Sequence, residues 1–249
     1  MMRAAVCIFS CMFITGCGAN RSADVSEFIL QNKDSLQSIK TDNAERVDSS
    51  GDAAGELAAD FSDLENVNAY SRAAVLGKVV GDKYNYVADG GLPWTFNTVA
   101  VEKVLKGDLN PGDIIAVGQQ TGYMSLRDYY NTVDEESQRI FDEYNPGYTE
   151  GELNTTYIWD DDGCPDLADG YKLILALSPR ELSGLDGAFW EITAGNYGQF
   201  FEVGNDKYMR IFDSMELEIS PYQEKVRENP ELPGVYTFEK LQSVFQYDA

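Results

Sequence analysis

The sequence contains no histidine among its 249 residues. A chain without imidazole cannot form a Ser-His-Asp or Cys-His catalytic pair, and it has no histidine general base. It also cannot build a zinc site that needs a histidine ligand. Most familiar hydrolase mechanisms are therefore excluded, and the sequence favours a protein that is not an enzyme.

Basic residues are scarce as well. The chain has 19 Lys and Arg against 42 Asp and Glu, which gives a net charge of −23. Proteins bind nucleic acids largely by neutralising phosphates with Lys and Arg, and no basic stripe reverses the acidic balance here. Nucleic acid is therefore not an expected partner. With 43% hydrophobic residues, the chain can still form a packed core.

The N-terminus combines a positive charge at Arg3 with an apolar run over residues 4–14. That run is too short to span a bilayer as a helix and has the form of an export signal. It ends in Ile14-Thr15-Gly16-Cys17, which resembles the lipobox of bacterial lipoprotein signal peptides. The resemblance implies removal of residues 1–16 and a diacylglycerol thioether on Cys17, which anchors the exported chain to the outer face of the membrane. The alternative is an ordinary secretory signal that contains a cysteine.

Cysteine is limited to four residues. Cys7 and Cys11 leave with the signal, and Cys17 carries the lipid. Cys164 then remains as a single thiol, so the mature chain forms no intrachain disulfide. We expect Cys164 to be a small buried residue.

Residues 17–58 are rich in Ser, Asp, Asn, Ala and Gly, which predicts a flexible tether. A random coil of this length spans about 35 Å, so the following domain would stand away from the membrane. Within the tether, Asp24 and Glu27 have capping-box spacing, and residues 25–39 place apolar side chains loosely on one helical face. We interpret this as a transient helix, with a docking or self-pairing helix as the alternative.

Residues 59–249 carry β-strand patterns. The clearest is a hairpin over residues 95–117, in which apolar residues alternate on both strands. The alternation slips before Val104, which predicts a β-bulge around residues 102–103. Asn110-Pro111-Gly112-Asp113 suits a type II turn.

Other segments also show the patterns of strands and helices. We predict further strands at residues 72–80, 171–177, 189–193, 200–203 and 208–212, and helices at residues 61–68, 221–228 and 237–245. Residues 81–94 are predicted to be a loop. Residues 118–166 are predicted to form a long acidic insertion with a helix at residues 133–144. Short strands broken by turns indicate a mainly β fold, a small barrel or a sandwich.

Three pieces of the chain resemble a known family. Residues 75–79 (VLGKV), 99–107 (VAVEKVLKG) and 164–175 (CPDLADGYKLIL) are similar to the netrin-like domain, the OB-type barrel also found in tissue inhibitors of metalloproteinases. The resemblance covers roughly residues 70–203 and implies a small OB-like β-barrel, here with the helical and acidic insertion and flanking helices. It does not imply protease inhibition, since those inhibitors use a free N-terminal cysteine and Cys17 would carry lipid.

An acidic run supplies the candidate metal site. Asp160, Asp162 and Asp169 lie around Gly163, and calcium prefers several oxygen ligands on a bent loop. Ile158 stands where an EF-hand loop has its first ligand, so the segment is not an EF-hand. A solvated acidic loop is the alternative, and no other cofactor is expected.

Aromatic residues gather in two segments, and flat rings beside carboxylates can bind sugars or peptides. The candidate ligand surface consists of Tyr84, Tyr86, Trp94, Tyr157 and Trp159. The alternative is that these rings pin the insertion onto the barrel.

Together, these observations predict non-enzymatic binding of an envelope protein or glycan. The alternatives are a carboxylate-dependent, glycosidase-like hydrolase and a structural or self-associating surface protein.

Overall fold

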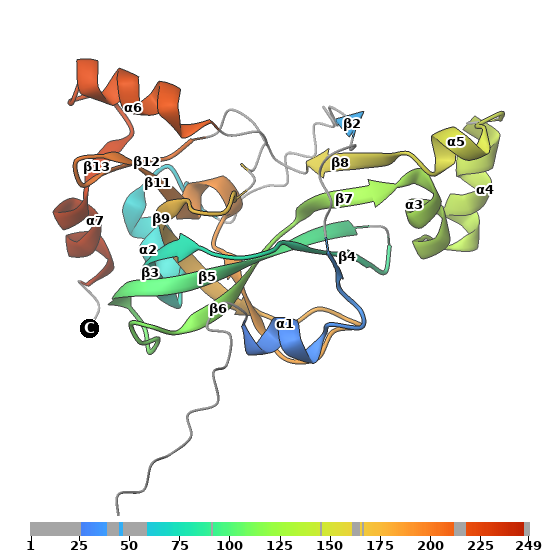
Figure 1. Cartoon of the computed structure of the whole chain (residues 1–249), viewed down its shortest axis with the longest axis horizontal. Coiled ribbons are helices and arrows are strands. Elements are labelled where there is room, and N and C mark those ends of the chain that lie inside the picture. The colour runs from blue at the N-terminus through green and yellow to red at the C-terminus, as the bar shows by residue number, and fades with distance from the viewer. Residues whose placement is uncertain are drawn as a thin grey trace, which may run out of the picture.

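The computed structural model describes residues 26–38, 45–46, 59–90, 92–144, 146–160, 165, 167–211 and 218–246 (Figure 1). The signal peptide predicted at residues 1–16, the lipid site Cys17 and the single thiol Cys164 lie outside these ranges. The expectations about them therefore stay predictions.

Five strands close into a barrel. They are β3 (Ala73–Val79), β5 (Leu92–Lys106), β6 (Ile114–Gln119), β9 (Lys172–Arg180) and β10 (Phe189–Ile192). Around the ring the order is β3–β5–β6–β10–β9 and back to β3, with every pair antiparallel except β6–β10. This closed ring is compatible with an OB-like barrel. The predicted fold class, mainly β with a small barrel and flanking helices, is confirmed.

The predicted bulge in β5 is present. Leu76 pairs with Lys103 and Gly77 pairs with Val101, so Glu102 is the extra residue. A bulge bends its strand and increases the local twist, which helps β5 to pair with β3 and β6 in one closed ring. The predicted turn after β5 is also confirmed, because Gly112 has a φ of 94°.

The barrel strand β9 is buried on both faces. Leu173, Leu175 and Leu177 belong to one core cluster, as the alternation predicts. Ile174 and Ala176 point the other way and are also fully buried, because α2 (Leu64–Tyr70) and α7 (Phe238–Phe245) cover that face. The helices therefore form a second hydrophobic layer outside the barrel.

The sheet continues past the barrel from β9. The added elements are η2 (Gly195–Gly198), β11 (Gln199–Gly204), β12 (Lys207–Met209), α6 (Ile219–Glu228) and β13 (Val235–Thr237). The predicted hairpin between β11 and β12 is confirmed, with Asn205 and Asp206 both at a φ of 54°. The helices predicted at residues 221–228 and 237–245 correspond to α6 and α7.

The prediction of a loop at residues 81–94 is wrong. Residues 84–88 form β4 (Tyr84–Ala88), which pairs with the first residues of β5. Pro93 lies inside β5 opposite Val87. Glycine and proline suggested a loop here, but the apolar side chains of Trp94 and Phe96 are buried in a third core cluster and hold the strand in place.

The prediction of a flexible tether is wrong for residues 26–38. Helix α1 (Glu27–Gln31) packs on the outside of the barrel, with Phe28 and Ile29 only 6% and 2% exposed. Strand β1 (Gln37–Ser38) then pairs with β4. The polar composition suggested a solvated segment, whereas a few apolar residues at helical spacing are enough to dock it.

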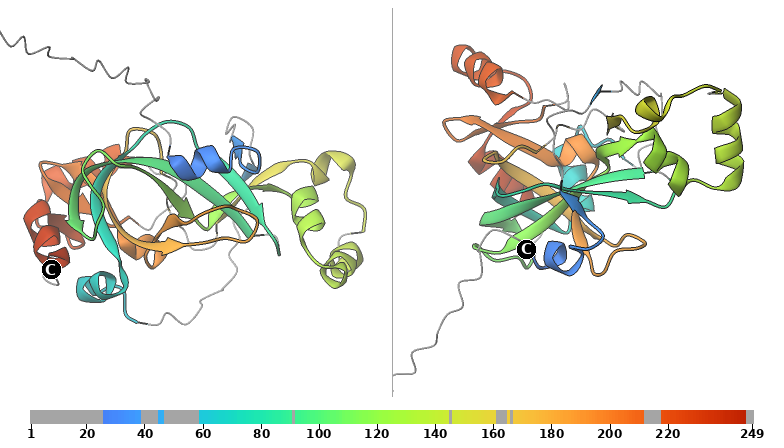
Figure 2. Two further views of the ribbon diagram at one scale, coloured as in Figure 1. Left: turned by 90° about the horizontal axis from the view of Figure 1, so that it is seen from below. Right: turned by 45° about the vertical axis from the view of Figure 1, so that its right-hand side comes forward.

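The insertion forms a lobe that projects from the barrel (Figures 1 and 2). Its elements are β7 (Thr121–Ser125), α3 (Leu126–Thr132), α4 (Glu135–Tyr144), α5 (Glu150–Leu153) and β8 (Thr156–Asp160). The strands β7 and β8 pair antiparallel, and β2 (Glu45–Arg46) pairs with β8. Helix α4 matches the helix predicted at residues 133–144.

Substitution of Gly118 tests barrel closure. A Cβ at Gly118 would lie 2.5 Å from Cε2 of Phe189 and 3.1 Å from Cε1 of Phe96. Gly118→Ala should therefore lower the free energy of unfolding by about 1–3 kcal/mol, measured by chemical denaturation. In α5, a Cβ at Gly151 would meet only Thr149 Oγ1, at 3.8 Å. Gly151→Ala should leave stability unchanged or slightly raised, and an equal loss in both variants would contradict the close approach at β6–β10.

Candidate functional site

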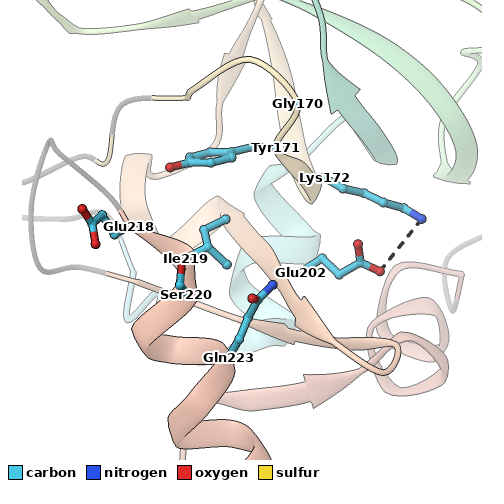
Figure 3. Close-up of a pocket in the computed structure, with 8 residues that line it drawn as sticks. All are labelled: Gly170, Tyr171, Lys172, Glu202, Glu218, Ile219, Ser220 and Gln223. Atoms are coloured by element: carbon cyan, nitrogen blue, oxygen red, sulfur yellow. Dashed lines mark ion pairs between the residues drawn. The ribbon is translucent and has the colours of Figure 1, made fainter.

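An open pocket of about 590 Å³ lies where the start of β9, strand β11 and the first turn of α6 meet (Figure 3). Its lining residues come from three separate parts of the chain: Gly170, Tyr171, Lys172, Glu202, Glu218, Ile219, Ser220 and Gln223. The pocket therefore exists only when the barrel, its sheet extension and α6 have assembled.

One side of the pocket carries a group of charges. The Lys172 ammonium lies 3.3 Å from a carboxylate oxygen of Glu102 and 3.9 Å from one of Glu202. Glu102 is the bulged residue of β5, so the bulge helps to bring this carboxylate toward β9. All three side chains are about a third exposed, and such pairs contribute at most about 1 kcal/mol to stability. Their main effect is to place one cation between two anions beside the pocket.

A fixed aromatic ring forms another side. The Tyr171 ring meets the Phe201 ring edge to face, with centroids 6.0 Å apart. Before it, Gly170 has a φ of 85°, and the Tyr171 N–H donates to the Ala168 carbonyl at 3.1 Å. The Val79 N–H also donates to the Tyr171 carbonyl, at 2.8 Å. The backbone on both sides of the ring is therefore held in place, in part by β3.

Helix α6 supplies the polar wall. The Ser220 hydroxyl and the Gln223 amide line the pocket beside the Glu218 carboxylate (Figure 3). Ile219 packs against the barrel core and fixes the start of the helix. The hydroxyl and amide of α6 lie between the Tyr171 ring and the Lys172–Glu202 pair (Figure 3), and such groups can hydrogen-bond a ligand rich in hydroxyl or amide groups.

The same carboxylates influence a buried tyrosine. Tyr208 lies opposite Glu202 in the β11–β12 pair and is 1% exposed. Burial raises the pKa of the Tyr208 phenol strongly, and the nearby carboxylates of Glu202, Asp206 and Glu102 raise it further. The neutral phenol is therefore the form that the folded state stabilises.

The structure separates the residues of the predicted aromatic surface. Trp94 is 1% exposed and packs against Phe96 and Phe189, so it belongs to the core and its assignment to a ligand surface is wrong. Tyr84 and Tyr86 are partly buried on β4, and burial raises the pKa of both phenols. The burial of Trp94 was not predicted, because Trp94 falls in the loop predicted at residues 81–94, where no strand alternation was expected.

The other predicted aromatic residues lie elsewhere. Tyr86 donates a hydrogen bond to the Ser183 carbonyl at 3.0 Å and lines a second pocket of about 200 Å³. Tyr157 is partly buried on β8, in the lobe. The side chain of Trp159 lies outside the described part of the structure. The second pocket is also lined by Asp128 and Thr132 of α3, so Tyr86 faces the lobe that carries Tyr157, whereas Trp94 is buried in the core.

The calcium hypothesis stays a prediction. Asp160 ends β8, Asp169 is exposed in the turn before β9, and Asp162 lies outside the described residues, as does the side chain of Asp160. Among the residues that are described, no group of three or more Cys, Asp or Glu side chains is arranged to hold a metal.

Sequence patterns did not identify the pocket. Only Gly170, Tyr171 and Lys172 fall in a segment that the family resemblance had marked, while Gln223 looked like an ordinary polar position of the helix predicted at residues 221–228 and Ser220 lay just before that helix. No local signal links α6 to β9, because 38 residues lie between the end of β9 and the start of α6.

Comparison of the chain with protein-family models, curated proteins and solved structures finds no match. None of the helices in the described ranges has the length and hydropathy needed to cross a bilayer.

The Tyr208 environment predicts a pH dependence. The folded-state pKa lies above the unfolded value of about 10, so the stabilisation is complete below that pH and is lost as the pH rises above it. Above pH ~10, the free energy of unfolding of the unmodified chain should fall faster than that of Tyr208→Phe, by up to about 1.4 kcal/mol per pH unit. Denaturant titrations across this range measure the difference.

Tyr70, which is 50% exposed, provides the matched control. Tyr70→Phe should keep the slope of the unmodified chain. If Tyr208→Phe also keeps it, the burial argument fails.

Proposed function

We propose that this chain is an exported bacterial lipoprotein that binds an envelope protein or glycan without catalysing a reaction. Lipid on Cys17 anchors it to the outer face of the membrane, and an OB-like barrel of the netrin-like kind carries the binding site. The lipobox resemblance supports the anchoring, and the closed five-stranded ring supports the choice of barrel.

The observation that carries the binding proposal is the pocket between β9, β11 and α6. It is open, its lining is mostly polar, and one tyrosine ring is held rigidly in its wall. A rigid ring with hydrogen-bonding groups around it favours sugars and extended peptides, which present both flat apolar faces and polar edges.

The alternative of a carboxylate-dependent hydrolase receives less support. A glycosidase needs one carboxyl group that stays protonated, which usually requires burial away from cations. Glu102 and Glu202 are both partly exposed and both face the Lys172 ammonium. The alternative of self-association through residues 24–40 is also less favoured, because Phe28 and Ile29 already pack on the barrel of the same chain.

The anchoring is tested by Cys17→Ser in intact cells. The unmodified chain should incorporate radiolabelled palmitate and fractionate with membranes, whereas Cys17→Ser should do neither, because the thioether needs the thiol. Cys164→Ser is the control and should keep both properties. Palmitate on the Cys17→Ser chain would contradict the assignment.

The pocket is tested with Ser220→Ala/Gln223→Ala. Each lost hydrogen bond costs about 0.5–1.5 kcal/mol, so the two together cost about 1–3 kcal/mol and the double variant should bind roughly 5- to 150-fold more weakly. The glycan arm measures cosedimentation with isolated peptidoglycan sacculi. The protein arm places a photo-crosslinking residue at position 223 and looks for one discrete adduct in intact cells.

Gln242→Ala on α7, and a crosslinker at position 242, are the matched controls. The variant should bind like the unmodified chain, and the crosslinker should give no adduct. Absence of both sacculus binding and a position-223 adduct would contradict the pocket as the binding site.

A further inference from the structure

Helix α1 is held on the barrel by two sets of contacts, the ring packing of Phe28 and the hydrogen bonds of Asn32, which we call the α1 clamp. Phe28 packs its ring on Phe96 and Phe189, with centroid distances of 5.2 and 5.5 Å. Asn32 is 4% exposed and bridges α1 to the loop between β9 and β10. Its amide donates to the Asp186 carbonyl at 2.9 Å, and its oxygen accepts from the Asp186 N–H at 2.8 Å.

This clamp also caps the helix itself. The same Asn32 amide group donates to the Phe28 carbonyl at 2.9 Å, and Ser26 accepts from the Ile29 N–H at the other end. At each end of this very short helix a side chain therefore hydrogen-bonds a backbone group, and the apolar face of the helix is buried. A helix of five residues is not stable alone, so the barrel surface is what holds it.

The position of the clamp shortens the membrane tether. Only nine peptide links separate Cys17 from Ser26, the first described residue. At about 3.3–3.6 Å per residue, a fully extended chain of this length reaches roughly 30 Å at most. The tether expected from composition ran to residue 58 and left the barrel free to turn in any direction.

The α1 clamp lies on the opposite side of the molecule from α6, the helix that lines the pocket. Figure 1 and the right-hand view of Figure 2 both place α1 at the bottom and α6 at the top, with the barrel between them. On its outer side α1 presents Leu30, which is 59% exposed, and the exposed Lys33 follows the helix. Glu27 and Asp34 are exposed there as well, so the face carries no net positive charge, and the short tether to Cys17 is what would hold it toward the lipid.

We infer that docking of α1 turns this face of the barrel toward the lipid surface and directs the pocket between β9, β11 and α6 away from it. The inference rests on the proposed lipid at Cys17. It assigns an orientation to the binding site: the pocket faces away from the lipid surface, toward envelope components on the far side of the protein.

The experiment uses the full acylated chain on vesicles of phosphatidylethanolamine and phosphatidylglycerol that carry an acceptor dye on the headgroups. A donor dye is placed by an unnatural amino acid either at Ser183, in the loop beside α1, or at Glu224, on α6. Energy transfer should be at least about two-fold greater from position 183, because the tether limits that side to roughly 30 Å from the lipid. Equal transfer from both positions on bound protein would overturn the inference.

A variant pair tests whether the clamp causes the orientation. Phe28→Ala/Ile29→Ala removes the two buried side chains of α1 and should bring the two transfer values together. Gln31→Ala, in the same helix but exposed, should keep them apart. A difference that persists in Phe28→Ala/Ile29→Ala, in a chain with an unchanged circular dichroism spectrum, would overturn the role of α1.

If the double variant fails to fold, a linker insertion gives the answer without touching α1. A Gly/Ser insert of about 30 residues after Asn20 roughly doubles the root-mean-square span of the tether, raises its fully extended reach about four-fold, and should abolish the difference between positions 183 and 224. Persistence of the difference would overturn the tether argument. Unmodified chain that shows no acyl mass at Cys17 and no vesicle binding would instead overturn the proposed anchoring, and the orientation with it.

Discussion

Closure of the barrel depends on a short parallel contact between β6 and β10. Trp190 pairs with Val117 and Glu191 pairs with Gly118, and these are the registered pairs that join the two strands. All other neighbours in the ring are antiparallel and several have longer registers. The contact requires Phe189 to pass close over β6, which the missing side chain of Gly118 permits. Without this contact the sheet would be open, and its inner apolar face would meet water.

Closure in turn sets the roles of the surrounding layers. A closed ring buries its inner side chains by itself, so the outer faces of the strands are free to hold other elements. Helices α2 and α7 cover one outer face, and α1 with β4 covers another. The edge of β9 that pairs with β10 at Leu177–Arg180 pairs with β11 at Leu173–Leu175, and β12 and α6 adjoin β11. The pocket lies at that extension, between the start of β9, β11 and α6.

The charges at the pocket are arranged unevenly. The chain is acidic overall, yet the bulged residue Glu102 and Glu202 share the ammonium of Lys172 at the pocket. The proposed orientation places this group away from the lipid and leaves α1 on the lipid side. Since α1 is both the docking element and the end of the short tether, one packing interaction would determine how the site is presented.

Local patterns in the sequence determined a large part of the fold. The β5–β6 hairpin, the bulge at Glu102, the turn at Gly112 and the alternation of β9 each depend on residues that are neighbours in the chain, and each is present. The absence of histidine limits the chemistry of the chain whatever fold it adopts. The family resemblance suggested an OB-like barrel, with which the closed ring is compatible.

The tertiary structure alone decided the burial of Trp94, the docking of α1 and the assembly of the pocket. In each case the deciding partner lies far away in the chain: Phe189 for both Trp94 and Phe28, and β9 for Gln223. Composition reports whether a segment is polar on average, but an apolar side chain is buried only where a complementary surface has formed. That surface exists once the ring closes, which is why the tether and the loop were predicted incorrectly and the hairpin was not.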